Sequence, residues 1–200
     1  MHHMKTVITH PPRLWTRQEI IAKPSPVPRE PGVYGWYFRN LPGSVHVADC
    51  LRYDDLVLAY VGISPKAPPT SGKPPSSQTL RSRIRYHLTG NCYGSTLRLT
   101  LGCLLADDLG IQLRRVSASG RMTFGPGERV LSEWLAENAY VTWLVNPRPW
   151  ELEERLIRKL SLPLNLDQNQ DHPFYPALST MRREAKRLAG DLPILQNKAL

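Results

Sequence analysis

Residues 32–39 read Gly-Val-Tyr-Gly-Trp-Tyr-Phe-Arg, and this stretch decides the fold. It is rich in β-branched and aromatic residues, and turn-forming residues follow it at 40–44, so it predicts a strand. Residues 56–63, Leu-Val-Leu-Ala-Tyr-Val-Gly-Ile, predict a second strand. A meander between the two strands would let them pair antiparallel. Each strand carries one tyrosine of interest, Tyr34 in the first and Tyr60 in the second.

Two contrasting segments follow the second strand. Residues 64–78 are so rich in proline that they predict a loop, since proline supplies neither a sheet donor nor a helix interior. Residues 79–88 predict a helix that Thr79 or its neighbour caps. The apolar face of this helix is formed by Leu80, Ile84 and His87 or Leu88. Three arginines fan out around the rest of it: Arg81, Arg83 and Arg85.

The middle of the chain predicts mainly helices. Residues 95–138 repeat apolar side chains at helical spacing, with a possible short hairpin that pairs 111–117 with 121–124. Residues 139–145 predict another strand. The Asn-Pro-Arg-Pro sequence at 146–149 then opens a helix that stops by Pro163, with acidic residues in its first turn and basic residues later, as suits a helix dipole.

The two ends of the chain differ in character. Residues 1–31 contain many prolines and no sustained apolar period, so they predict an irregular leader with at most a short helix near 16–22. The packed domain is therefore expected to begin about Gly32. Residues 177–188 predict a basic amphipathic helix, whose cations are Arg182, Arg183, Lys186 and Arg187.

Composition bounds the class of protein. The chain has 200 residues, of which 41% are hydrophobic and 22% charged, and this excludes a wholly disordered chain. No segment approaches the roughly 18 to 20 apolar residues of a membrane span, and the first residues lack the apolar core of a signal peptide. We therefore expect a soluble, cytoplasmic protein without a membrane partner. The three cysteines form no CxxC pair, so they predict neither a disulfide framework nor a zinc site. A formal net charge of +9 favours polyanionic partners.

The order of these motifs resembles the GIY-YIG nuclease superfamily. Gly-Val-Tyr at 32–34 and Tyr-Val-Gly at 60–62 stand where the family has its first two motifs. The predicted arginine helix matches the family pattern, with the active arginine at Arg83 and a histidine four residues later at His87. Residues 153–165 match the family's glutamate helix and closing asparagine. The long loop and the large insertion before residue 139 look more like the restriction-endonuclease branch.

The resemblance implies a small α+β fold, with an antiparallel or mixed central sheet flanked by helices and a largely helical insertion. It places the nuclease domain at 32–165, between the leader and a basic helical extension at 166–200. It implies a metal-dependent endonuclease that uses Mg²⁺ or Mn²⁺ to hydrolyse DNA phosphodiester bonds, which leaves 5′-phosphate and 3′-hydroxyl ends. The site residues that it implies are Tyr34, Tyr60, Arg83, His87, Glu153 and Asn165.

The residue types fit that chemistry. Phosphodiester hydrolysis needs a nucleophilic water, neutralisation of charge on the phosphoryl oxygens and help for the leaving oxygen. A divalent cation held by one carboxylate can supply the last two, and Glu153 is the candidate ligand. Its main rival is Glu154, which is turned about 100° around the helix. Arg83 offers the phosphate a fixed fork of donors that a lysine lacks.

By the same resemblance, Tyr34 takes the proton of the attacking water, but an unperturbed phenol titrates near about 10. Cationic neighbours are therefore expected to lower its pKa. Tyr60 is expected to position water or phosphate, and Asn165 to anchor the turn after the glutamate helix. His87 is open between a proton shuttle, a phosphate contact and a satisfied, partly buried histidine. The cations that could act on Tyr34 are Arg83, Arg85, His87, Lys66 and Lys73.

Several alternatives stay open on the sequence alone. Tyr34 and Tyr60 taken singly are typical of half-buried strand aromatics. The basic C-terminal helix is equally typical of a solvated face and of a DNA-backbone contact. A catalytically inactive module that binds DNA or RNA and a protein-interaction domain are alternative functions, and the protein could be a monomer or a homodimer. The candidate nucleic-acid contacts are Arg81, Arg85, Lys66, Lys73, Arg182, Arg183 and Lys186.

Overall fold

The two predicted strands pair antiparallel at the centre of a sheet. The structure is a computed structural model that describes residues 6–69, 71 and 76–195, so Lys73 lies outside the described residues. Within that part of the chain, five antiparallel strands form the main sheet in the order β1-β7-β2-β4-β3. Their bounds are β1 Trp15–Thr16, β2 Gly32–Phe38, β3 Arg52–Tyr53, β4 Leu56–Ser64 and β7 Ala139–Val145. The α+β fold is confirmed, and the short strand β3 was not predicted.

A β-bulge in β4 decides which side chains face the site. Trp36 of β2 lies opposite Tyr60, whereas Tyr37 lies opposite Leu58, so Ala59 is the extra residue. Side chains alternate between the faces of a strand, and one extra residue reverses that alternation. Leu58 therefore packs on one face of the sheet, although Tyr60, two residues later, packs on the other.

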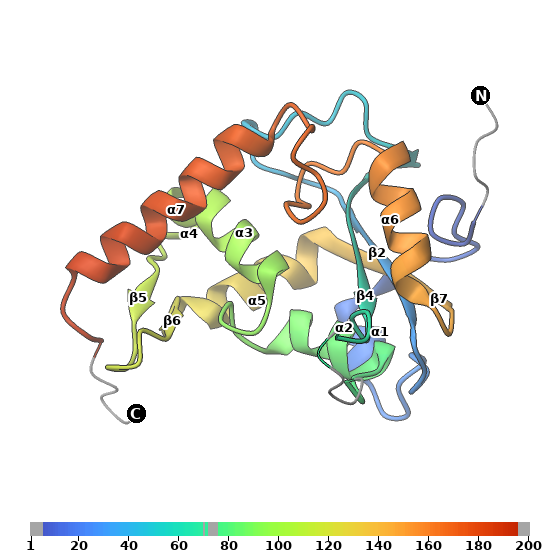
Figure 1. The fold of residues 1–200 in the computed structure, drawn as a ribbon, viewed down its shortest axis with the longest axis horizontal. Helices are drawn as coiled ribbons and strands as arrows, with labels where there is room; N and C mark the ends of the chain where they lie inside the picture. Colours follow the sequence, from blue (N-terminus) through green and yellow to red (C-terminus); the bar gives the residue numbers. More distant parts are fainter. Residues whose placement is uncertain (1–5, 70, 72–75, 196–200) are drawn as a thin grey trace.

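Helices cover both faces of this sheet (Figure 1). On one face lie α2 (Leu80–Thr89), α3 (Thr96–Leu104) and α5 (Gly127–Asn138); on the other lies α6 (Pro149–Lys159). The predicted helix 79–88 is confirmed, since Thr79 caps α2 by accepting a hydrogen bond from the Ser82 N–H. Helix α7 (Tyr175–Asp191) is longer than predicted and packs outermost, against α3.

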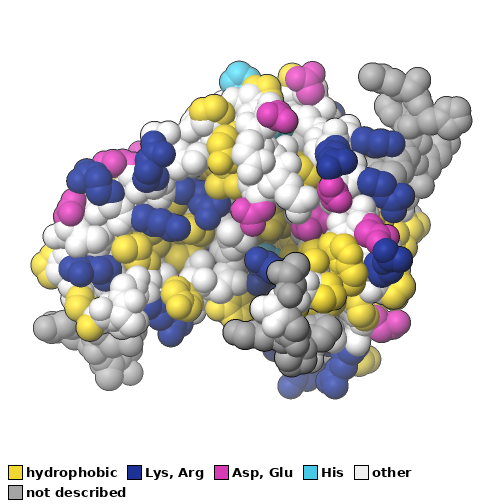
Figure 2. Space-filling view, in the orientation of Figure 1, with side chains coloured by type: hydrophobic (Ala, Val, Ile, Leu, Met, Phe, Trp, Pro, Cys, Tyr) yellow, Lys and Arg dark blue, Asp and Glu magenta, His cyan; other side chains and the backbone are white. Residues whose placement is uncertain are grey.

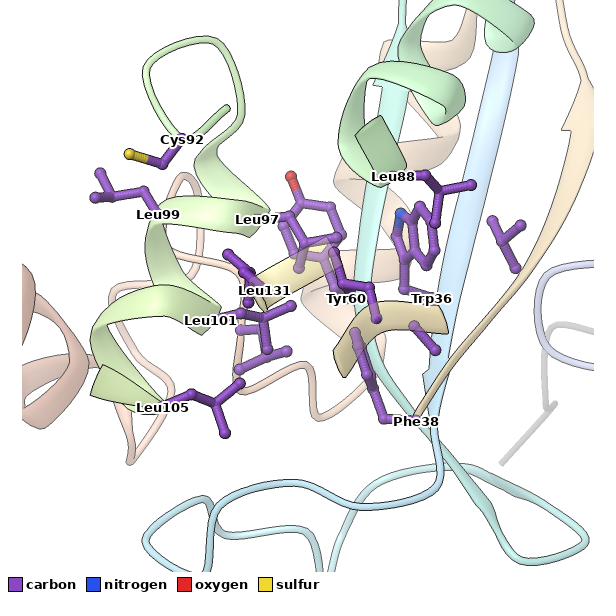
Figure 3. Close-up of a cluster of buried hydrophobic side chains, with 14 of the residues drawn as sticks. Trp36, Phe38, Tyr60, Leu88, Cys92, Leu97, Leu99, Leu101, Leu105 and Leu131 are labelled. Carbon is purple, nitrogen blue, oxygen red and sulfur yellow. The ribbon is translucent and has the colours of Figure 1, made fainter. Parts of the chain in front are cut away.

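The larger core cluster lies between the sheet and the insertion. Figure 3 shows Leu97 and Leu101 of α3 facing Tyr60 and Phe38 of the sheet. The predicted apolar face of α2 is also buried here. Cys50, Cys92 and Cys103 are buried and free. The insertion is thus an integral wall of the core.

The leader does more than the sequence predicts. Ile8, Ile20 and Val27 are buried in the two core clusters, and β1 adds a strand at the edge of the sheet. Carbonyls of Pro28 and Glu30 accept hydrogen bonds from the first N–H groups of α2, which a helix leaves unpaired. The prediction that packing begins about Gly32 is wrong, because isolated apolar residues can be buried without any periodic pattern. The short helix near 16–22 is confirmed as α1 (Arg17–Ile21).

The predicted hairpin exists in shortened form, as β5 (Arg114–Arg115) paired with β6 (Met122–Thr123). A single helical turn, α4 (Ala106–Leu109), precedes it. Among the described residues, no helix is both long and apolar enough to cross a membrane.

Candidate active site

One cleft brings together side chains from distant parts of the chain. Its volume is about 680 Å³, and its walls come from β2, β4, α2, the start of α3, α6, α7 and three loops. Five of the six predicted site residues line it, and the sixth, His87, lies directly behind it. The lining residues used below are Tyr34, Tyr60, Gly62, Lys66, Tyr93, Arg83, Gly94, Glu153, Asn165, Asp167 and Arg182.

Gly62 is needed because the Tyr34 side chain lies across it. The two residues are directly opposite in the β2–β4 pair. A Cβ atom on Gly62 would lie 2.6 Å from the Tyr34 hydroxyl oxygen, well inside van der Waals contact. The first-motif tyrosine and the second-motif glycine are therefore one packing unit, and any side chain at 62 would displace the phenol from the cleft.

A buried hydrogen-bonded chain leads from Tyr34 into the protein. The Tyr34 hydroxyl lies 2.8 Å from His87 Nε2, and His87 Nδ1 lies 2.7 Å from the Ser95 hydroxyl. His87 is fully buried, so it does not contact a phosphate directly. Burial, followed by the charges of Arg83 and Arg98, lowers its pKa well below the usual value, which keeps the imidazole neutral.

The environment of the two tyrosines differs from the expectation. Burial raises the pKa of Tyr34. The charges of Tyr60 and Glu153 raise it further, whereas the charge of Arg83 lowers it. Burial also raises the pKa of Tyr60 to about 12. The prediction that cations lower the pKa of Tyr34 is wrong, because the cost of burying a phenolate exceeds the attraction of the neighbouring guanidinium. Tyr34 is a neutral phenol at the start of any reaction.

Arg83 is held in place at the cleft wall. Its Nη1 donates a hydrogen bond to the Gly94 carbonyl at 2.7 Å, which fixes the guanidinium beside Tyr34. The neighbouring arginines lie elsewhere. Arg81 Nε donates to the Val27 carbonyl at 2.6 Å and so ties the leader to α2, and Arg85 is exposed outside the cleft. Of the three arginines of α2, only Arg83 lines the cleft.

Glu153 faces the cleft, whereas Glu154 does not. Leu156 and Ile157 bury the neighbouring side of α6 against the sheet. Glu154 instead pairs with Arg158 on the solvent side. Burial and, to a smaller extent, the charge of Asp167 raise the pKa of Glu153 to about 7, against the opposing charge of Lys66. A carboxylate whose charge is disfavoured in this way is stabilised by any cation that enters the cleft.

Asn165 is built into the sheet rather than free in the cleft. Its Nδ2 donates to the Val61 carbonyl and its Oδ1 accepts from the Val61 N–H, both at 2.9 Å. The Leu164 N–H donates to the carbonyl of Ala59 at the bulge. This arrangement continues the ladder of β4 and anchors the turn after α6, as the sequence predicts. It fixes β4 between Tyr60 and Gly62.

The basic C-terminal helix reaches the site through one residue. Arg182 lines the cleft and donates to the Thr100 hydroxyl at 3.3 Å, while Arg183 and Lys186 are exposed. Figure 2 shows Lys and Arg side chains gathered along α7. Lys66 lines the cleft from the proline-rich loop. Sequence reasoning missed Asp167 and Tyr93 as cleft residues; no local pattern distinguishes either from an ordinary loop residue.

The donor set of the cleft fits a hard divalent cation. Glu153 and Asp167 offer carboxylate oxygens in one cleft, and the charge of Asp167 contributes to the raised pKa of Glu153. No group of three or more His, Cys, Asp or Glu within the described residues could hold a metal. Mg²⁺ commonly keeps several waters and binds through one or two carboxylates plus substrate phosphates, which is the mode this cleft allows.

A family model described as the GIY-YIG catalytic domain matches residues 32–184. The chain belongs to the GIY-YIG family. No curated protein and no solved structure matches it. The matched range contains every residue that the resemblance implied, and it extends through α7 as far as Glu184. Membership of this family indicates a nuclease and DNA as the partner class. The large insertion, 95–138, lies inside the matched range of this GIY-YIG protein.

Proposed function

We propose that this protein is a metal-dependent endonuclease whose active site is the cleft between β2, β4, α2 and α6. The observation that carries the proposal is the convergence of Tyr34, Arg83 and Glu153 from three separate elements on one cleft. The products are DNA ends with 5′-phosphate and 3′-hydroxyl groups, as in the family that the chain resembles.

Activation of the attacking water uses the buried chain of hydrogen bonds. A neutral phenol cannot accept a proton unless it gives one up. Tyr34 therefore takes the water's proton while it passes its own to His87 Nε2, whose Nδ1–H is donated to Ser95. The imidazolium that forms is disfavoured by burial and then by the charges of Arg83 and Arg98, and the negative charge of a bound phosphate beside Arg83 offsets part of that cost.

The other side chains stabilise the phosphate. Arg83 is held by Gly94 with its guanidinium beside Tyr34, so it can donate to the non-bridging oxygens. Glu153, with Asp167 nearby, would hold Mg²⁺ or Mn²⁺, which when bound supplies charge neutralisation and help for the leaving 3′ oxygen. Tyr60 lies in the same cleft and positions water or phosphate, and Asn165 positions Tyr60 through β4.

We expect the bound DNA to extend from the cleft along the basic residues of α7. Arg182 lines the cleft, and the exposed Arg183 and Lys186 continue along α7. Contacts of this kind to phosphates position the substrate without reading its sequence. The described part of the chain offers one cleft with this set of residues, so a double-strand cut requires two protomers or two successive cuts by one protomer.

Cleavage of plasmid and branched DNA with and without Mg²⁺ or Mn²⁺ tests the proposal. We expect nicking or cutting only with the metal, and loss by about 10² to 10³-fold or more in Tyr34→Phe and in Glu153→Gln. Glu154→Gln is the matched control, since it changes the adjacent carboxylate on the solvent side and should leave the rate unchanged. Products that ligase can rejoin would establish the 5′-phosphate and 3′-hydroxyl ends.

Two results would contradict the proposal. If both Tyr34→Phe and Glu153→Gln still cut DNA, the roles assigned to Tyr34 and Glu153 are wrong. Salt-sensitive DNA binding without any metal-dependent cutting would instead identify a binding module on the same scaffold.

A further inference from the structure

Tyr93 is an exposed aromatic side chain at the edge of the cleft. It is 66% exposed, the highest value among the large hydrophobic side chains that the structure describes as exposed. It lines the cleft from the loop between α2 and α3. Cys92 and Ser95, on either side of Tyr93 in this loop, are both buried. The loop is therefore attached to the core at both residues, and the Tyr93 ring is exposed between them.

The loop that carries Tyr93 is fixed by hydrogen bonds. Asn91 Oδ1 accepts from the Tyr93 N–H at 3.2 Å and from the Tyr86 hydroxyl at 3.1 Å. Glu128 Oε1 accepts from the Cys92 N–H at 2.9 Å. A ring held exposed on a fixed loop loses little conformational entropy when a ligand stacks on it, so the arrangement is pre-organised for binding.

The loop that carries Tyr93 also holds Arg83, the arginine proposed to bind phosphate. Gly94, which follows Tyr93 directly in the chain, accepts the hydrogen bond from Arg83 Nη1. Tyr93 and Arg83 both line the cleft, so a base at Tyr93 and a phosphate at Arg83 can belong to the same strand.

A cation accompanies the ring. Arg121 directly precedes β6, and its guanidinium carbon lies 5.0 Å from the centre of the Tyr93 ring. Aromatic rings and arginine planes both stack on nucleobases, and the positive charge attracts the strand that carries the base. Both groups come from residues outside the four motifs.

We propose that Tyr93 and Arg121 form a stacking subsite for a nucleobase next to the cut phosphate. In an intact duplex both faces of a base are covered by its neighbours, so the subsite takes a base that is single-stranded or locally unstacked. This inference rests on the proposed nuclease function. It narrows the substrate to DNA with an unpaired or distorted position at the cut.

Binding without metal tests the subsite. The probes are a short single-stranded DNA of mixed sequence and an abasic strand of the same length and charge, in EDTA. We expect Tyr93→Ala and Tyr93→Leu to weaken binding of the base-bearing strand by about 5- to 100-fold and that of the abasic strand by less than about two-fold. Tyr93→Phe should retain the wild-type preference. Tyr140→Leu is the matched control, because Tyr140 lies beneath Arg39 at 5.2 Å but outside the cleft.

The outcomes separate this inference from the proposed function. Equal losses on both strands, or no loss in Tyr93→Ala, would overturn the stacking subsite even if the wild type cuts DNA with metal. Wild-type protein that binds neither strand and cuts nothing would overturn both. Since Tyr93 is exposed, its variants should melt at the wild-type temperature, which circular dichroism checks.

Discussion

Two arginine–glutamate sets in this molecule use the same residue types in opposite ways. Arg98 is fully buried and donates to both the side chain and the carbonyl of Glu128, to Ser132 and to the His87 carbonyl. Arg83 and Glu153 share the cleft, and no ion pair joins them within the described residues. The first set is satisfied internally. The second leaves charge directed at a space where a ligand can enter.

The comparison teaches that pairing, and not residue type, separates structural charges from functional ones. Buried charges are tolerated when every donor has an acceptor. Charged groups in a cleft that no ion pair neutralises are stabilised when a phosphate or a cation binds beside them. His87 lies between the two sets, because both Arg83 and Arg98 lower its pKa.

The largest expected effect comes from breaking the satisfied pair. Arg98→Met leaves the Glu128 carboxylate, which is only 14% exposed, without its cation. We expect a loss of about 3 to 5 kcal/mol in the free energy of unfolding, measured by urea denaturation. The double variant Arg98→Met with Glu128→Gln should recover part of that loss, since no unpaired charge remains. A single variant as stable as the wild type would contradict the structural role.

The cleft arginine should behave in the opposite manner. Arg83→Lys keeps the charge but loses the fork of donors, so we expect cutting to fall by about 10²-fold while the melting temperature stays unchanged. Arg85→Lys, on the exposed side of the same helix, is the control and should keep its rate. A variant Arg83→Lys that loses stability but keeps its cutting rate would show that Arg83 has a structural role, as Arg98 does.

Acid should destabilise the protein through His87. Its pKa is depressed in the folded state, so the unfolded chain takes up a proton first as the pH falls through about 6.5. The contribution of neutral His87 to the free energy of unfolding is complete above that pH and decreases below it. At pH 5 this contribution is about 2 kcal/mol smaller than at pH 7.5. Denaturation of the wild type and of His87→Gln at both pH values measures this, because the variant should lack this component. An equal pH dependence in both proteins would show that His87 is not buried as neutral imidazole.

The smallest effect is expected at a solvent-exposed pair. Arg158 and Glu154 lie one turn apart on the outer side of α6. Arg158→Ala should change the free energy of unfolding by less than about 0.5 kcal/mol and leave cutting unchanged. A larger change would show that exposure alone does not predict which charged groups matter here.

Much of the fold could be predicted because its signals are local. The β-branched and aromatic run at 32–38, the apolar run at 56–64, the Thr79 cap and the apolar face of α2 each lie within a few residues of sequence. The choice of Glu153 over Glu154 also follows from helical spacing, and the cleft geometry agrees with it. The Arg98–Glu128 pair could not be predicted, because its partners are far apart in sequence and neither residue differs locally from a surface charge.

The sequence by itself determined the order of the elements and the side chains available for chemistry, since both depend on short-range patterns of polarity and size. Only the tertiary structure decided how those side chains are used. The bulge at Ala59 turns Tyr60 to the same face as Tyr34, and the depth of packing raises the pKa of Tyr34 despite Arg83. Both results depend on contacts summed over the whole fold, which no local pattern contains.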